Sequence, residues 1–561
     1  MFRKSPWPQI TILFIITIFS VAVLNNSIAG NEQMYLKLDK GLFYLKQVYE
    51  TISQNYVDEL DPEGLSKSAI HGIVEELDPY TVFFEKKGSE HLDMITKGKY
   101  GGLGMEISKQ EGEITVISPI DNTPAQRAGI RAGDIIVTIG EEATKELTLE
   151  QASSKLRGPA GTEVTLEIKR PGLNDPIKLT MTREDIVIKD ISYAGFIEPG
   201  TAFLRLSSFS DKAASELKEA LRKLEKNGDI ERVILDLRGN PGGLLASAVE
   251  VANVFVPKGE LIVETRGNHE RETQFDTPQG AMLSDVPLVV LVDGGSASAS
   301  EIVAGAIQDL DRGVVIGSRT FGKGLVQQVY PVDKVNDAFI KITTAKYYIP
   351  SGRCIQKDDY KKNQDVFTNM SDTADFNNHT KYYTRNGRVV YGGGGITPDI
   401  KVDKPRLNQY VMALWMQGHF FKFTVDYLAK HPDITVENGF KVTDQIVSDF
   451  RRYLSEKEMD FDIEGEGELE KFLELAEQEK YSDDMVDLVE VALQKLGQEK
   501  TLQFDKNIKR IKESLETEFA EKLGGNSARI ATLLEHDESV DAALEVLRRP
   551  EEYQQILAVK N

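Results

Sequence analysis

The stretch 286–328 constrains the fold most, because it alternates apolar runs with loops of small residues. One apolar run ends at Val292, and the loop 294–298 after it contains only glycine, alanine and serine. A second apolar run, 314–317, precedes the loop Thr320-Phe321-Gly322-Lys323-Gly324. Short apolar runs that alternate with helical segments predict an α/β layered fold whose strands are covered on both faces.

The two loops supply a serine and a lysine that together suit nucleophilic catalysis. A serine hydroxyl becomes an effective nucleophile only when a base takes its proton. A lysine can be this base when burial lowers its pKa from about 10.4 toward neutrality. Lys323 has glycine and apolar neighbours in the sequence and no adjacent carboxylate that would hold its charge. None of the histidines lies in a triad motif, so we expect them to be structural.

A helix is expected from about residue 298 to 310, directly after the serine loop. The N–H groups at a helix N-terminus favour negative charge, so the N–H of Ala299 is a candidate oxyanion donor. We expect Ser296 and Ser300 to serve in the turn and the helix cap, and Glu301 to be a structural carboxylate.

The run Ser-Ala-Ser-Ala-Ser-Glu at 296–301 and the lysine loop at 320–324 resemble the active-site motifs of the carboxy-terminal processing (tail-specific) proteases. These are serine peptidases with a Ser–Lys dyad. The resemblance implies that Ser298 is the nucleophile, Lys323 the general base and Gln327 the residue that orients the lysine. It also implies a crotonase-like protease body. Two further stretches match the family: 343–353 and 393–400.

A second glycine loop, Leu-Asp-Leu-Arg-Gly-Asn-Pro-Gly-Gly at 235–243, resembles another motif of the same family. The resemblance implies that this loop supplies the second oxyanion donor, from the N–H of either Gly242 or Gly243. The loop also resembles the nucleophile loop of trypsin-like proteases that carry PDZ domains. Pro241 stands where the serine of those enzymes would be, and proline cannot act as a nucleophile, so that fold is disfavoured.

Residues 98–184 resemble a PDZ domain, with a Gly-Gly-Leu-Gly loop at 101–104 followed by an Ala-Gly-Ile-Arg-Ala-Gly-Asp run. Free N–H groups in a glycine loop form a nest for a carboxylate, and the neighbouring strand edge can pair with an extended peptide. The ligand is therefore expected to be a free C-terminus. Arg157 is either an exposed arginine or a sensor that links peptide docking to the protease body. The predicted peptide-binding residues are Gly102, Leu103, Gly104, Met105 and Arg157.

The N-terminus resembles a secretory signal. Arg3 and Lys4 form a positive start, residues 10–24 are an apolar stretch, and Ser27-Ile28-Ala29 offers small residues to a signal peptidase. A membrane span needs about 20 apolar residues, so cleavage is favoured over a retained anchor. Either outcome exports the protein, to the periplasm or the cell envelope.

Composition excludes several kinds of partner and cofactor. The net charge of −22 argues against nucleic acid as a partner, because phosphate binding needs a basic surface. The single cysteine, Cys354, rules out an intrachain disulfide and a cysteine-rich zinc site. The sequence also lacks the HExxH and CxxC patterns, so neither a metal nor another cofactor is expected.

The predicted architecture is multidomain α/β (α+β): a crotonase-like protease body with an inserted PDZ-like β domain and helical regions at both ends. In the N-terminal region the stripe Leu38, Leu42 and Leu45 predicts a helix and favours burial of this face in a core, with an interaction surface as the alternative. The acidic C-terminal extension is either a solvated appendage or a module for self-association or adaptor docking. The predicted segments are 1–29 (signal peptide or anchor), 30–97 (N-terminal helical), 98–184 (PDZ), 185–402 (protease) and 403–561 (C-terminal helical).

These features predict an exported serine endopeptidase that captures protein or peptide substrates by their unstructured C-terminal tails and cleaves them through an acyl-enzyme. The PDZ domain is expected to gate the site as well. The alternative is a non-catalytic peptide-binding or adaptor protein on the same scaffold.

Overall fold

The computed structural model describes residues 34–85, 94, 96–268, 271–333, 337–357, 380–402, 408–434, 440–457, 459 and 461–558. The chain forms two compact units, Met1–Leu77 and Asp78–Asn561. The predicted signal or anchor lies outside the described residues. Within those ranges, no helix has both the length and the apolar composition needed to cross a membrane.

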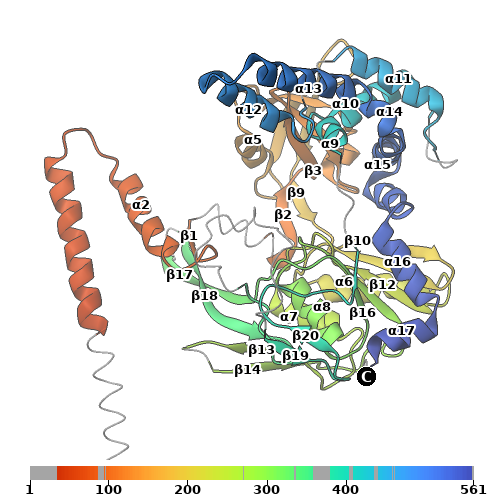
Figure 1. The fold of residues 1–561 in the computed structure, drawn as a ribbon. Helices are drawn as coiled ribbons and strands as arrows, with labels where there is room; N and C mark the ends of the chain where they lie inside the picture. Colours follow the sequence, from red (N-terminus) through yellow and green to blue (C-terminus); the bar gives the residue numbers. More distant parts are fainter. Residues whose placement is uncertain are drawn as a thin grey trace, which may run out of the picture. The chain divides into compact units, whose positions relative to one another are not determined.

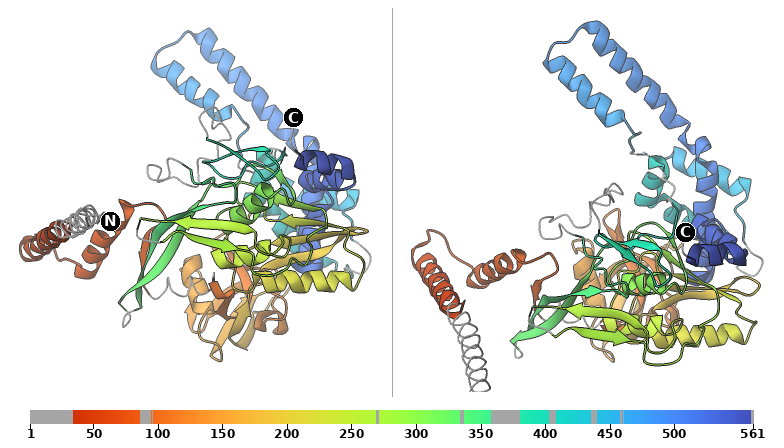
Figure 2. Two further views of the ribbon diagram at one scale, coloured as in Figure 1. Left: turned by 90° about the horizontal axis from the view of Figure 1, so that it is seen from below. Right: turned by 60° about the horizontal axis from the view of Figure 1, so that its bottom comes forward.

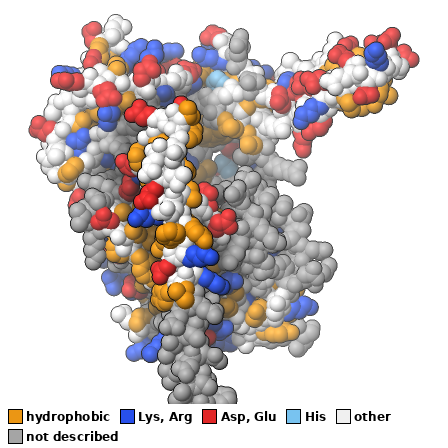
Figure 3. Space-filling model, turned by 90° about the vertical axis from the view of Figure 1, so that its left-hand side faces the viewer, with side chains coloured by type: hydrophobic (Ala, Val, Ile, Leu, Met, Phe, Trp, Pro, Cys, Tyr) orange, Lys and Arg blue, Asp and Glu red, His pale blue; other side chains and the backbone are white. Residues whose placement is uncertain are grey.

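The first unit contains a helix over residues 34–55 and helix α2 (Pro62–Glu75). The side chain of Asp61 caps the N-terminus of α2, and the hydroxyl of Tyr49 joins the two helices by donating to the carbonyl of the first α2 residue (2.6 Å). The predicted stripe lies on the first helix, but Leu42 is 63% exposed, contrary to the predicted core. Figure 3 shows apolar side chains gathered along these helices.

The PDZ region is an antiparallel sheet with two short helices. Its core is formed by alternate strand residues such as Ile114, Val116, Ile136 and Leu166, because successive side chains of a strand point to opposite faces. The sheet order is β3 (Met105–Gln110), β4 (Glu113–Pro119), β5 (Ile135–Ile139), β7 (Glu163–Lys169) and β8 (Ile177–Thr182), with β6 (Glu142–Ala143) on β5 and helices α4 (Pro124–Arg127) and α5 (Leu149–Leu156). Among the described strands β3 pairs only with β4, so its other edge is open.

The chain enters and leaves the PDZ region side by side. Strand β2 (Lys99–Gly102) pairs antiparallel with β9 (Glu184–Val187), and Lys99 Nζ lies 2.9 Å from a carboxylate oxygen of Asp185. Paired first and last strands are what an inserted domain requires. The predicted limits of the domain fall at these two strands and stay predictions.

The predicted protease body is built on a largely parallel sheet that is covered on both faces. Its strands follow the order β10 (Ile191–Glu198), β11 (Thr201–Leu206), β12 (Arg232–Asp236), β15 (Leu288–Val292), β16 (Val314–Gly317) and β21 (Ile400–Lys401). One face packs against α6 (Ala213–Glu225), α7 (Leu245–Ala252) and α8 (Ala299–Asp309). The α/β layering expected from the apolar runs is confirmed.

The other face of this sheet packs against the last two helices of the chain, α16 (Glu538–Leu547) and α17 (Pro550–Leu557) (Figure 1). Ile234 and Val289 of the sheet share a core with Val540 of α16. The end of the predicted C-terminal extension therefore completes the protease body.

A second sheet carries the lysine loop at one of its ends. Its order is β1 (Val82–Phe84), β18 (Ala338–Tyr348), β13 (Leu261–Arg266) and β14 (Thr273–Asp276), and β17 (Leu325–Asp333) also pairs with β18. The strands β19 (Lys381–Tyr383) and β20 (Val389–Tyr391) form a separate hairpin. Because β17 begins directly after the lysine loop, its pairing with β18 fixes where that loop ends.

The remaining C-terminal helices form their own aromatic core, which includes Phe420, Phe450 and Phe519. They are α9 (Gln409–Met416), α10 (His419–Lys430), α11 (Asp444–Ser455), α14 (Gln503–Lys506) and α15 (Ile508–Leu534). Helices α12 (Glu466–Gln478) and α13 (Asp483–Thr501) lie side by side as a helical hairpin (Figure 2).

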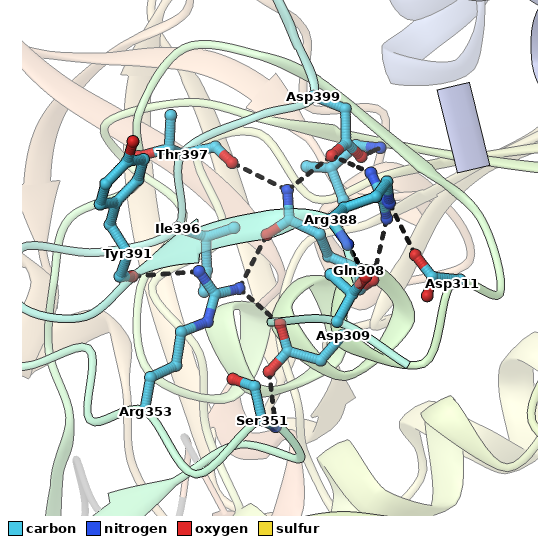
Figure 4. A network of polar contacts seen from close by, with 12 residues as sticks. Gln308, Asp309, Asp311, Ser351, Arg353, Arg388, Tyr391, Ile396, Thr397 and Asp399 are labelled. Carbon is cyan, nitrogen blue, oxygen red and sulfur yellow. Dashed lines mark hydrogen bonds and ion pairs between the residues drawn. The ribbon is translucent and has the colours of Figure 1, made fainter. Parts of the chain in front are cut away.

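Helix α8 is anchored at its C-terminal end by a buried polar network (Figure 4). Arg353, only 1% exposed, donates to Asp309 (2.7 Å) and to the side chain of Gln308 (2.8 Å). Gln308 in turn donates to Asp399, which also pairs with Arg388 (2.6 Å). A helix fixed in this way cannot slide along the sheet, so the residues at its other end are held in place.

Candidate active site

Ser298 lies at the N-terminus of α8, in a strained backbone conformation. Its φ of 54° and ψ of −112° are rare for a residue with a side chain and persist only where the surroundings enforce them. Asp293 helps to hold this conformation, because its Oδ1 accepts hydrogen bonds from the N–H groups of Gly295 (2.9 Å) and Gly239 (2.8 Å). One carboxylate therefore joins the serine loop to the glycine loop at 235–243.

Glu301 joins the serine loop to the lysine loop. It is fully buried, and its carboxylate accepts hydrogen bonds from the N–H groups of Ser298 (2.9 Å), Gly322 (2.7 Å) and Lys323 (2.9 Å) and from the hydroxyl of Thr320. Burial raises the pKa of Glu301 to about 7, and the four donors oppose that rise. All of these neighbours donate, so the geometry favours the ionised carboxylate. The expected structural role of Glu301 fits these contacts.

The side chain of Lys323 is largely buried and suited to losing its proton. Burial, with a smaller contribution from the positive charge of Lys341, lowers the pKa of Lys323 to about 8. Its Nζ donates to Oε1 of Gln327 (3.1 Å), which is the orienting contact that the sequence resemblance implied. The ring of Tyr80 lies 4.7 Å from the same Nζ. This surrounding can hold a neutral amine at mildly alkaline pH.

The structure brings Ser298 and Lys323 to one site without joining their side chains. Both backbones contact Glu301, and the hydroxyl of Tyr347 lies within hydrogen-bond distance of the carbonyls of both residues. Among the hydrogen bonds of the described residues, none links the serine hydroxyl to the lysine amine. Catalytic hydrogen bonds are often loose in a free enzyme and tighten when substrate binds.

The glycine loop lies directly against the serine loop. A Cβ added to Gly242 would come within 2.9 Å of the Ala299 nitrogen, so only glycine allows this approach. The N–H of Gly242 already donates to the side chain of Asn240 (2.9 Å). The N–H groups of Gly243 and Ala299 donate to no acceptor among the described residues. Of the two glycines that the sequence left open, Gly243 therefore has the available donor.

The predicted peptide-binding residues lie together at the start of the PDZ sheet. Gly104 has a φ of 78°, and a Cβ there would lie 2.3 Å from Thr123, so the loop requires glycine. The carbonyls of Leu103 and Gly104 accept hydrogen bonds from within the domain. Gly102 ends β2 and Met105 begins β3, whose open edge lies next to α5. The open edge of β3 is therefore where a peptide strand would be expected to pair.

Arg157 follows α5 and lies over the ring of Tyr100, with its guanidinium carbon 4.9 Å from the ring centre. It lines a cavity of about 440 Å³ together with Lys97, Lys99 and Gly101. This places Arg157 beside the glycine loop, and its role as a sensor of peptide docking stays a prediction.

Three residues of the site were not foreseen from the sequence. Tyr80 and Lys341 lie near Lys323, and Tyr347 contacts the carbonyls of both dyad residues. Tyr347 falls within a stretch that matches the family motif, which was a usable signal. No sequence pattern pointed to Tyr80, because only the folded chain brings it close to the lysine loop.

In the part of the chain that the structure describes, no group of three or more histidine, cysteine or acidic side chains could hold a metal ion.

Models of known protein families match four parts of the chain. The model of the peptidase family S41 matches residues 200–366, and a PDZ domain model matches 115–170. Two helical-domain models match the ends: the activating protease CtpB N-terminal domain over 20–88, and the C-terminal helical domain of probable PDZ-proteases over 410–547.

Curated relatives give the same picture. The chain is 36% identical over 406 residues to a carboxy-terminal-processing protease of Bartonella bacilliformis, across 71% of this chain and 84% of that protein. It is 34% identical over 350 residues to a probable CtpA-like serine protease of Staphylococcus aureus, across 62% of this chain and 68% of that protein. A solved structure of the photosystem II D1 C-terminal processing protease is 28% identical, with a TM-score of 0.34, over 64% of this chain and 91% of that one.

The predicted fold class is confirmed: an α/β protease with a PDZ insert and helical domains at both ends. The chain therefore belongs to the S41 family of carboxy-terminal-processing serine proteases.

Proposed function

We propose that this protease is exported, recognises unstructured C-terminal tails through its PDZ domain, and cleaves the captured chain through an acyl-enzyme on Ser298. One observation carries the proposal. Lys323 is largely buried, has a pKa lowered to about 8 and is hydrogen-bonded to Gln327, next to the strained turn that holds Ser298. A serine at a helix N-terminus with such a lysine beside it suits acyl transfer.

In the acylation step, Oγ of Ser298 attacks the carbonyl carbon of the scissile bond while the neutral Nζ of Lys323 takes the hydroxyl proton. The new C–O bond leaves the negative charge on the carbonyl oxygen. The lysine ammonium then gives its proton to the leaving amine as the C–N bond breaks. A water molecule, deprotonated by the same Nζ, attacks the ester, and the proton returns to Oγ. This cycle uses one base twice and needs no cofactor.

The oxyanion of both steps is expected to accept hydrogen bonds from the N–H groups of Ala299 and Gly243. Support comes from the contact of the adjacent Gly242 with the serine loop and from the absence of an acceptor for either group among the described residues. The commitment of the Gly242 N–H to Asn240 argues for Gly243 as the donor. Removing one such donor typically lowers kcat by about 10²–10³-fold.

The PDZ domain is expected to hold the substrate by its C-terminal carboxylate, with the chain added as a strand at the open edge of β3. The PDZ domain is inserted through the β2–β9 pair, and Arg157 lies beside its glycine loop. This arrangement suits a domain that controls access to the protease active site. Export to the periplasm or cell envelope rests on the apolar N-terminal sequence, cleaved or kept as an anchor. Adaptor docking by the C-terminal region is a further proposal.

The proposal is tested with a loosely folded protein that ends in a free, apolar C-terminus. We expect the unsubstituted enzyme to degrade it and both Ser298→Ala and Lys323→Ala to be inactive. The same substrate with an amidated C-terminus should be cleaved poorly, because it lacks the carboxylate. Cleavage that survives both substitutions would show that the active site lies elsewhere, and equal cleavage of the two substrates would contradict tail recognition.

A further inference from the structure

The oxyanion loop is tied to the C-terminal helical region by a partly buried arginine. Arg238 immediately precedes the glycines of the loop, and its guanidinium contacts two carboxylates at once. Its Nε and Nη2 donate to Asp236 (2.8 and 2.9 Å), and its Nη1 lies 2.8 Å from Oδ2 and 2.9 Å from Oδ1 of Asp537. Asp236 is fully buried, while Arg238 and Asp537 are 14% and 19% exposed.

Asp537 sits at a fixed point of the fold. It is the N-cap of α16, and its Oδ1 accepts hydrogen bonds from the N–H groups of Ser539 (2.9 Å) and Val540 (3.2 Å). Helix α16 packs on the protease sheet. In the next helix, Tyr553 exchanges hydrogen bonds with the main chain of Leu288 (3.0 and 3.1 Å). A carboxylate held by a helix that is itself packed on the sheet can serve as a rigid anchor for Arg238.

The rest of the oxyanion loop is held by hydrogen bonds to its neighbours. Gly239 donates to Asp293, and the side chain of Asn240 donates to the carbonyl of Leu206 (2.8 Å) and accepts from Gly242. The carbonyl of Asn240 accepts from the N–H of Ala297 (3.0 Å) and from the hydroxyl of Ser300 (2.9 Å). Because Arg238 directly precedes these linked residues, a shift at Arg238 changes where the glycine donors that follow are held. Small displacements of a catalytic donor have large effects on rate.

We propose that Asp537 is a positioning residue of the protease. Through Arg238 it fixes the oxyanion loop, so that the C-terminal helical region takes part in catalysis as well as completing the fold. This inference rests on the proposed role of the loop as oxyanion donor. It assigns a function to the acidic extension that its sequence, which carries no catalytic motif, did not indicate.

The test variant is Asp537→Asn. Asparagine caps helices as well as aspartate, so α16 keeps its cap while Arg238 loses one of its two charged partners. The control is Glu545→Gln on the same helix, which removes the exposed ion pair with Arg549 (2.6 Å). We expect Asp537→Asn to lower kcat about tenfold, less than the loss of a whole donor, with KM and melting temperature close to those of the control.

Two further readouts separate positioning from general damage. A peptide aldehyde, whose tetrahedral adduct uses the oxyanion donors, should bind about tenfold more weakly to Asp537→Asn, in step with kcat. The affinity of a fluorescent C-terminal peptide should be unchanged. In a double-mutant cycle with Arg238→Gln, the two substitutions should not be additive, because they break the same link.

An Asp537→Asn variant with the kcat and aldehyde affinity of the control would overturn the inference. A lower melting temperature of Asp537→Asn, with an unchanged kcat for each folded molecule, would also overturn it. Failure of the unsubstituted enzyme to cleave, or cleavage that survives Ser298→Ala, would refute the proposed function and this inference with it.

Discussion

Replacing Lys323 with methionine should abolish activity and at the same time stabilise the folded protein near neutral pH. The pKa of Lys323 falls from 10.5 for a free lysine to about 8 in the fold. Below pH 8 the lysine is protonated in both the folded and the unfolded chain, so the folded state bears the full cost of holding the buried charge. Each tenfold change in an equilibrium is worth about 1.4 kcal/mol, which makes this cost about 3 kcal/mol.

Methionine removes that cost but leaves the side-chain carbonyl of Gln327 without its donor, which costs about 1–3 kcal/mol. The net expectation at pH 7 is a gain of up to about 2 kcal/mol in the free energy of unfolding. The sign follows from proton uptake. Between pH 8 and 10.5 the unfolded chain binds more protons at this lysine than the folded protein, so the unsubstituted protein becomes more stable as pH rises. The advantage of Lys323→Met should therefore vanish by about pH 10.

Urea denaturation at pH 7 and pH 10 measures this difference directly. The exposed Lys258→Met is the matched control, and its effect should be small and equal at both pH values. A stability difference between Lys323→Met and the unsubstituted protein that does not change between pH 7 and pH 10 would refute the reasoning, because it would mean that the lysine is not held with a lowered pKa.

Four more outcomes follow from the same geometry. The rate constant kcat/KM should rise with pH around a midpoint near 8, where Lys323 loses its proton. Lys341→Met, which removes a nearby positive charge, should move that midpoint to higher pH; a pH–rate profile with the midpoint unmoved would contradict this. Glu301→Gln should lower the free energy of unfolding by about 2–4 kcal/mol, because an amide cannot accept from all four donors, and urea denaturation that shows no loss would argue against the bridging role. Arg353→Met should cost about 3–5 kcal/mol by leaving Asp309 buried without its partner, and a cost below 1 kcal/mol in the same assay would exclude that account.

The parts of the site that are local in sequence could be predicted. Ser298 and Lys323 lie in short motifs at the ends of buried strands, and a serine before a helix already implies a donor at Ala299. The alternation of apolar runs with helices also predicted the layered body. These features depend on neighbours within a few residues, which a single sequence displays.

The remaining features depend on contacts between distant segments. The choice of Gly243 over Gly242 as the oxyanion donor depends on the hydrogen bond between the N–H of Gly242 and the side chain of Asn240. Tyr80 reaches the lysine from another part of the chain. Asp537 was one of many acidic residues in the extension, and only the packing of α16 shows that it meets Arg238. The exposed face of the N-terminal helix was wrongly assigned to a core, because periodicity shows that a face is apolar and not what covers it.

The most direct test of the account is mass spectrometry of an acid-quenched reaction between the protease and an excess of an unstructured, tail-bearing substrate. We predict an ester adduct of the N-terminal cleavage fragment on Ser298, present in the unsubstituted enzyme and absent from Ser298→Ala and Lys323→Ala. An adduct on another residue, or rapid cleavage by Ser298→Ala, would contradict the assignment of the nucleophile.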